Sequence, residues 1–149
     1  MRIAKAAEPA FWDASGIVLL CTEQRETANA RRLRERFRRL VVWWGTPVEV
    51  RSALRRLTRE EVLSAADMAE PDARLSRLRD LAAEIEPTEQ VRELASAMLD
   101  QHDLRGADAL QLAAALVLWR ERPRGRPFVC YDKKLRAAAD AAGFTVLPA

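Results

Sequence analysis

Short apolar runs alternate with longer segments of helical periodicity along this chain. The runs at residues 10–12, 40–44, 128–131 and 144–147 are typical of buried strands, and Pro87 would hold a further short strand near Ile85 to the edge or end of a sheet. Helical spacing is expected at residues 17–21, 27–39, 47–61, 89–100, 104–120 and 133–142, and between a break at Pro71 and residue 84. Strands alternating with helices predict an α/β fold, an α/β/α sandwich with a central parallel sheet.

Length and turn chemistry support one compact unit. A chain of 149 residues has the usual size of a single domain, and we expect one domain over residues 1–149. Gly143 follows the last predicted helix and is a suitable left-handed cap for it.

Four acidic residues stand where this fold would turn them toward a common pocket. Asp13 and Asp132 close predicted strands, Glu49 opens a helix, and Asp108 interrupts an apolar helix face. In parallel sheets, sites form at the carboxyl ends of the strands. Gathered carboxylates repel one another unless a divalent cation neutralises them. The set therefore predicts a site for a hard metal ion, Mg²⁺ first and Mn²⁺ as a possibility.

Three of these acids also have a purely structural interpretation. Asp13 and Asp132 could each be the N-cap of the helix that follows. Glu49 stands three residues after Thr46, with Pro47 between them, which is the pattern of a capping box with proline at the first helical position. None of the three settles the matter alone.

Asp108 resists that interpretation because its helix stripe is apolar. The stripe continues through Leu112, Ala115, Leu116 and Trp119 and is expected to face a core. A carboxylate at that position needs a cation, a hydrogen-bonding partner or a raised pKa.

Charge favours an anionic partner. The chain has 25 Lys and Arg against 22 Asp and Glu, so without the four pocket acids 18 acids remain and the net charge rises from +3 to +7. Six arginines lie within residues 31–39, either on a solvated helix face or on a surface that grips an RNA backbone or an acidic partner.

Cysteine use and hydropathy point to the cytoplasm. Cys21 and Cys130 are flanked by apolar residues and are expected to be reduced core thiols. The first residues contain no apolar stretch of signal-peptide length, and Asp108 and Gln111 interrupt the most apolar helix. We expect a soluble cytoplasmic protein without a membrane segment.

The acids and their neighbours together resemble a PIN domain, and most closely the VapC-type toxins of type II toxin–antitoxin systems. The similarity rests on Asp13-Ala-Ser15 after a short apolar segment, Glu49 in Thr-Pro-Val-Glu-Val-Arg-Ser-Ala-Leu, Asp108 in Leu-Arg-Gly-Ala-Asp-Ala-Leu-Gln-Leu, and Asp132 in Val-Cys-Tyr-Asp-Lys-Lys-Leu. It covers nearly the whole chain in order and length. Two departures are Pro9 and Trp12 in the first strand, and Cys130 where a threonine or serine is common.

The resemblance implies a Mg²⁺-dependent endoribonuclease toxin. Asp13, Glu49, Asp108 and Asp132 match the family's acidic metal-binding set, and Ser15 matches the hydroxyl residue after the first aspartate. Such a site hydrolyses an RNA phosphodiester with metal-activated water. The implied partners are an RNA substrate, a cognate antitoxin and a second copy of the chain.

Two other functions remain open at this point. A PIN fold could keep its acids for stability and only bind RNA or a partner. A phosphatase of the haloacid-dehalogenase kind also places an aspartate after its first strand, but it needs a second aspartate where this chain has Ser15.

Overall fold

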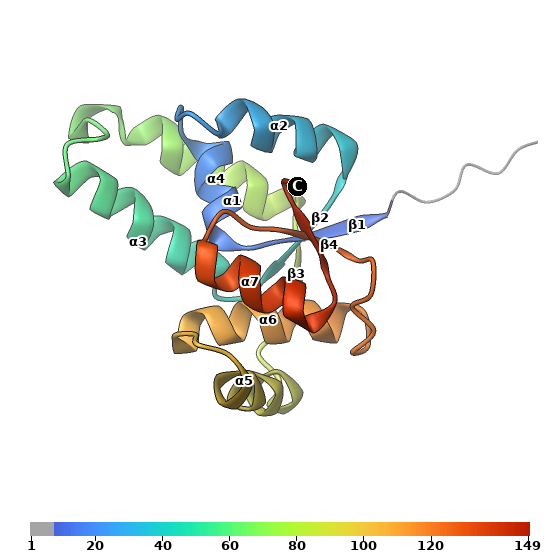
Figure 1. Cartoon of the computed structure of the whole chain (residues 1–149). Coiled ribbons are helices and arrows are strands. Elements are labelled where there is room, and N and C mark those ends of the chain that lie inside the picture. The colour runs from blue at the N-terminus through green and yellow to red at the C-terminus, as the bar shows by residue number, and fades with distance from the viewer. Residues whose placement is uncertain (1–7) are drawn as a thin grey trace, which may run out of the picture.

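The computed structural model describes residues 8–149. Within them, a parallel sheet of five strands in the order β3-β2-β1-β4-β5 is covered by seven α-helices on its two faces (Figure 1). The α/β/α sandwich expected from the pattern is therefore confirmed. The strands are β1 (Pro9–Trp12), β2 (Arg39–Trp43), β3 (Ala83–Ile85), β4 (Pro127–Val129) and β5 (Thr145–Leu147). The helices are α1 (Ala14–Cys21), α2 (Thr27–Arg36), α3 (Thr46–Arg59), α4 (Ala69–Leu81), α5 (Glu89–Gln101), α6 (Gly106–Leu118) and α7 (Lys133–Ala142), with a short 3₁₀ turn at Ala65–Asp67.

Each face of the sheet has its own core. Side chains alternate along a strand, so Phe11 of β1 points toward the core formed with α5, α6 and α7, while Ala10 and Trp12 point toward the core formed with α1 to α4. Both layers are apolar, which explains why the strands appear in the sequence as continuous hydrophobic runs. Both cysteines are buried and free, as expected.

The strand order places a crevice beside β1. From β1 the chain adds β2 and then β3 on one side, whereas β4 and β5 lie on the other side. The helix after β1 therefore covers one face and the helix after β4 covers the other. At such a switch point the two following loops separate and leave a crevice outside the carboxyl ends of the strands. The residues that follow β1 and β4 are placed at this crevice.

Several boundaries differ from the pattern. The arginine-rich helix α2 ends at Arg36 instead of residue 39, because Phe37 is extended and Arg39 already begins β2. Pro71 does not break the chain but lies in the first turn of α4, where the N–H that proline lacks has no helical partner in any case. Strand β4 ends at Val129, so Cys130 and Tyr131 belong to the loop before α7.

The predictions of an edge strand near Pro87 and of a helix cap at Gly143 are confirmed. Strand β3 lies at the edge of the sheet, as Pro87 indicated. Gly143 ends α7 with φ of 112°, the left-handed conformation expected of its cap. None of the helices between residues 8 and 149 combines the length and apolarity needed to cross a membrane. The expectation about a signal segment falls partly on residues 1–7, outside the described residues.

Candidate active site

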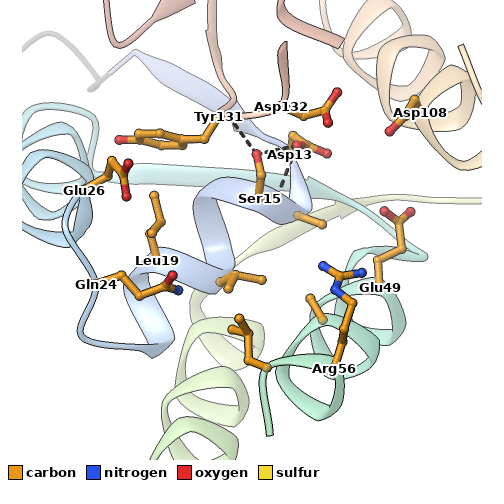
Figure 2. Close-up of a pocket in the computed structure, with 14 residues that line it drawn as sticks. Asp13, Ser15, Leu19, Gln24, Glu26, Glu49, Arg56, Asp108, Tyr131 and Asp132 are labelled. Carbon is orange, nitrogen blue, oxygen red and sulfur yellow. Dashed lines mark hydrogen bonds between the residues drawn. The ribbon is translucent and has the colours of Figure 1, made fainter. Parts of the chain in front are cut away.

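One pocket at the crevice contains all five residues singled out from the sequence. It has a volume of about 460 Å³, and its walls include Asp13, Ser15, Glu49, Asp108 and Asp132 (Figure 2). These residues come from the β1–α1 junction, α3, α6 and the β4–α7 junction. Segments more than a hundred residues apart thus meet at one opening.

Asp13 lines this pocket, and its interpretation as a helix N-cap is confirmed. It directly follows β1, and its backbone N–H donates to the carbonyl of Val129 in β4 at 3.0 Å. Its carboxylate is the N-cap of α1 and accepts hydrogen bonds from the Ser15 hydroxyl at 2.6 Å and the Ser15 backbone N–H at 3.2 Å. The residue is only 4% exposed. Capping fixes this buried carboxylate in place and leaves it on the pocket wall.

Ser15 and Cys130 connect Asp13 to the neighbouring loop. The Ser15 Oγ accepts a hydrogen bond from the backbone N–H of Tyr131 at 2.8 Å, which ties the start of α1 to the β4–α7 loop. The Cys130 thiol lies 3.4 Å from Asp13 Oδ2 and donates to it. Burial raises the pKa of this thiol, so it remains a neutral donor. The thiol therefore gives Asp13 the contact that a hydroxyl would give.

Asp132 is the N-cap of α7, as one interpretation of the sequence predicted. Its Oδ2 accepts the backbone N–H of Leu135 at 2.9 Å. Unlike Asp13 it is exposed, and it stands at the rim of the same pocket. Asp132, like Asp13, therefore both caps a helix and lines the pocket.

The capping-box interpretation of Glu49 is wrong. Helix α3 begins at Thr46 and its N-cap is Gly45, which has no side chain to cap with, so Pro47 is the second helical residue. The Thr46 hydroxyl is turned inward instead and accepts a hydrogen bond from Gln111 Nε2 at 2.9 Å. Glu49 is therefore not needed to begin the helix and lines the pocket from its first turn.

Asp108 lies in the first turn of α6, half-buried at the pocket. The stripe below it is buried as predicted, with Leu112 and Ala115 inaccessible to solvent and Leu116 nearly so. The core thus holds α6 rigidly and presents Asp108 at the pocket end of the helix.

Burial raises the pKa of Asp13, Glu49 and Asp108, and neighbouring carboxylates raise the pKa of Glu49 and Asp108 further. Burial is the largest cause for Asp13, whose pKa is raised despite the hydrogen bonds from Ser15. Burial, and then the charges of Asp13 and Asp108, raise the pKa of Glu49 to about 7, although a hydrogen bond with Gln111 acts in the opposite direction. The pKa of Asp108 is also raised, by burial and by the charges of Asp132 and Asp13. Repulsion from neighbouring acids thus adds to burial at Glu49 and at Asp108.

This cluster fits a hard cation by its charge and by its donors. Among residues 8–149, no Lys or Arg makes a salt bridge to any of the four carboxylates. Nor do any three Asp, Glu, His or Cys side chains in that range form a ready-made metal cage. Mg²⁺ is commonly held by one or two carboxylates with the remaining positions filled by water. The donor set therefore suits Mg²⁺ bound partly through water.

The pocket also has a second arm that the sequence did not reveal. Tyr131, Gln24 and Glu26 line this arm, on the side away from Asp108, whereas Arg56 lines the pocket beside Glu49 (Figure 2). The Tyr131 hydroxyl donates to Asn29 Oδ1 at 2.6 Å, which fixes the ring. Tyr131 could have been suspected as the neighbour of Asp132, but nothing in the local pattern marks the other three.

The arginine cluster is partly used for local structure. The Arg34 guanidinium donates to the carbonyls of Phe37 and Arg38, which ends α2, and Arg31 forms an ion pair with Glu23. The Arg36 guanidinium lies 4.8 Å from the centre of the Phe37 ring. These contacts favour the interpretation as an ordinary helix surface for at least half of the cluster.

Comparisons with known proteins identify the family. No family model matches the chain. Two curated proteins of Mycobacterium tuberculosis strains, named ribonuclease VapC45 and ribonuclease VapC49, are each 30% identical over 148 residues, covering 93% of this chain and 94% of their own length. A crystal structure of PAE2754 from Pyrobaculum aerophilum shares the fold, with a TM-score of 0.59 and 20% identity over 97% of this chain and 93% of that one.

The geometry defines an α/β/α protein whose acidic residues gather in a pocket at the switch point of the sheet. At this identity and coverage, the chain belongs to the VapC family of PIN-domain ribonucleases.

Proposed function

We propose that this protein is a Mg²⁺-dependent endoribonuclease and the toxin of a type II toxin–antitoxin system. The observation that carries the proposal is the convergence of Asp13, Glu49, Asp108 and Asp132 on one pocket without a neutralising Lys or Arg salt bridge within residues 8–149. Membership of the VapC family supports it.

In this proposal each side chain has a definite task. Asp13, Asp108 and Asp132 hold the cation directly or through water, and Glu49 helps to hold it or orients the attacking water. Ser15 keeps Asp13 in place through its 2.6 Å hydrogen bond. Bound Mg²⁺ or Mn²⁺ lowers the pKa of a water ligand and stabilises charge on the phosphodiester oxygens. The protein itself forms no covalent intermediate.

The proposed partners follow from the same assignment. The substrate is RNA, whose phosphates are attracted by the basic excess outside the pocket, and Arg105 at the start of α6 stands near Asp108. A cognate antitoxin would cover the pocket, a second copy of the chain would form a homodimer, and the cytoplasm would be the place of action.

Cleavage of total RNA tests the proposal. We expect the purified protein to cut RNA with Mg²⁺ or Mn²⁺, to stop in excess chelator, and to resume when the metal is restored. Asp13→Asn keeps the cap geometry but removes the buried charge, and it should abolish cutting while the circular dichroism spectrum is unchanged. Cleavage that persists in chelator would contradict the proposal.

A second candidate is a PIN fold that binds RNA or a partner without cutting. The absence of a ready-made metal cage among residues 8–149 favours it. Retained RNA binding together with no cleavage under any divalent metal would support this function. The phosphatase considered from the sequence gains no such support, because Ser15 occupies the place of its second aspartate and donates to Asp13.

A further inference from the structure

Gln111 is an unusual residue for its position. It is inaccessible to solvent, in a helix whose neighbouring residues 112–115 are Leu, Ala, Ala and Ala. An unpaired amide group in such surroundings destabilises a fold by about 1–3 kcal/mol. A leucine would avoid that loss, so the contacts of this amide call for an explanation.

The amide bridges the two helices that carry Asp108 and Glu49. Gln111 follows Asp108 by three residues on α6, and its Nε2 donates to Thr46 Oγ1 at 2.9 Å. Thr46 precedes Glu49 by three residues on α3, so the two lie on the same side of that helix. A hydrogen bond with Gln111 also acts on the Glu49 carboxyl. The Gln111 amide therefore lies between Thr46 and Glu49.

One half of this amide lacks a partner. Within residues 8–149 the Gln111 Oε1 is buried and accepts no hydrogen bond. The Gln111 Nε2 carries two N–H groups. One of them donates to Thr46 Oγ1, and the second is the group that can donate to the Glu49 carboxylate. The nitrogen end of the amide therefore serves both helices.

We propose that Gln111 is a positioning residue that holds the ionised Glu49 carboxylate against the pocket, so that α3 and α6 present Glu49 and Asp108 to the same cation. The inference rests on the proposed function. An amide suits this task because it donates an N–H without adding charge. Partners that orient a metal ligand in this way typically change metal affinity by about 10–100-fold when they are removed.

Mn²⁺ binding to the full chain without RNA tests the inference by a double-mutant cycle. Gln111→Met keeps a similar shape and removes both hydrogen-bonding ends. We expect it to weaken Mn²⁺ binding about 10–100-fold in isothermal titration calorimetry. In a Glu49→Gln background the same substitution should have no further effect, because its target is gone. Gln101→Met, on the exposed end of α5, is the matched control and should bind like the wild type.

Independent losses from the two substitutions would overturn the inference, since Gln111 would then act through general packing. Equal Mn²⁺ affinity of the wild type and Gln111→Met would overturn it as well, and would leave the proposed function standing. A wild-type chain that binds no Mn²⁺ would overturn both.

A spectroscopic measurement covers the case in which Gln111→Met does not fold. The side-chain NH₂ resonances of Gln111 in the folded wild type should shift when Mg²⁺ is added, and should not shift in Glu49→Gln. Thr46→Val removes only the hydroxyl that anchors the amide, and it should weaken Mn²⁺ binding by a smaller factor than Gln111→Met. Gln111 NH₂ resonances that do not shift when Mg²⁺ is added to the wild type would contradict the inference.

Discussion

The carboxylate of Asp72, on the outer surface of α4, differs from the pocket carboxylates in its partners and in the direction of its pKa shift. Asp72 accepts two hydrogen bonds from the Arg55 guanidinium, at 2.8 and 3.1 Å, and this pairing lowers its pKa. Asp108 has carboxylates for neighbours, and its pKa is raised. Arg56 follows Arg55 on the same helix and lines the pocket, yet it makes no salt bridge to a pocket acid within residues 8–149.

The difference shows that the lack of salt bridges to the pocket acids does not come from a lack of basic residues in the chain or beside the pocket. A chain with 25 Lys and Arg could pair these acids if stability alone were favoured. Leaving them unpaired keeps the pocket without a neutralising positive partner, as the proposed cation site requires. Perturbed carboxyl groups gathered in a cleft are a recognised mark of functional sites.

The largest expected effect comes from the change of aspartate to asparagine in the pocket, compared with the same change on the outer surface. Asp108→Asn should reduce RNA cleavage by about 10³-fold, since a metal ion contributes several kcal/mol to the transition state and each tenfold in rate corresponds to about 1.4 kcal/mol. Asp72→Asn removes a surface pair and should cut RNA at the wild-type rate. Initial rates on one labelled RNA measure both. Equal losses in the two variants would erase the distinction between the regions.

The next effect is stabilisation by metal. A ligand that binds only the folded state at 100 times its dissociation constant stabilises it by about 2.7 kcal/mol. Mg²⁺ or Mn²⁺ at that excess should therefore raise the melting temperature of the wild type and of Asp72→Asn by on the order of 5–10 °C. Asp108→Asn should show little of this shift in the same thermal scans. A rise of the same size in all three proteins would place the ion elsewhere.

A smaller effect depends on pH in the absence of metal. The pKa of Glu49 is raised to about 7 from an ordinary value of 4.5. Between these values the folded state binds a proton that the unfolded state releases, so stability should fall as the pH rises from 4.5 to 7. Glu49→Gln removes this contribution, and its unfolding free energy should change less across that window by about 1–3 kcal/mol. Urea unfolding at several pH values gives the answer, and identical slopes for both proteins would refute it.

The smallest effect concerns the basic surface. Arg32 is exposed on α2, and one lost phosphate contact should reduce the slope of log affinity against log salt by about 0.7 for single-stranded RNA. Binding of an uncleavable RNA to Arg32→Ala at several salt concentrations measures this slope. Arg34→Ala is the informative comparison, because it removes the contacts that end α2 and should lower stability as well. An unchanged slope for Arg32→Ala would remove this arginine from the RNA surface.

Periodicity identified the elements but not their ends. The runs around Val41 and Phe128 were recognisable because a sheet covered on both faces makes its strands continuously apolar. The end of α2 was misplaced because arginine has a good helix propensity, while pairing with β1 draws Arg39 into β2. Tertiary contacts outweighed the local preference there.

The acids of the site could be found because they interrupt the pattern, whereas their surroundings could not. Glu49 was recognised because it stands at the start of a predicted helix. The capping box attributed to it was wrong, since the Thr46 hydroxyl turns inward to Gln111. That contact joins residues 65 apart in sequence, and no local signal announces it. Tyr131 entered the pocket for a similar reason, through a loop whose path is set by Ser15.

The pairing of β1 with β4 also determines when the acidic pocket can form during translation. The surroundings of Asp13 are completed by Val129, Cys130 and Tyr131, and Asp132 arrives only with them. A nascent chain that still lacks these residues has one half of the crevice and no opposing wall. For the nuclease proposed above, a growing chain therefore has an incomplete set of acids until residue 132 has been added, close to the end of its synthesis.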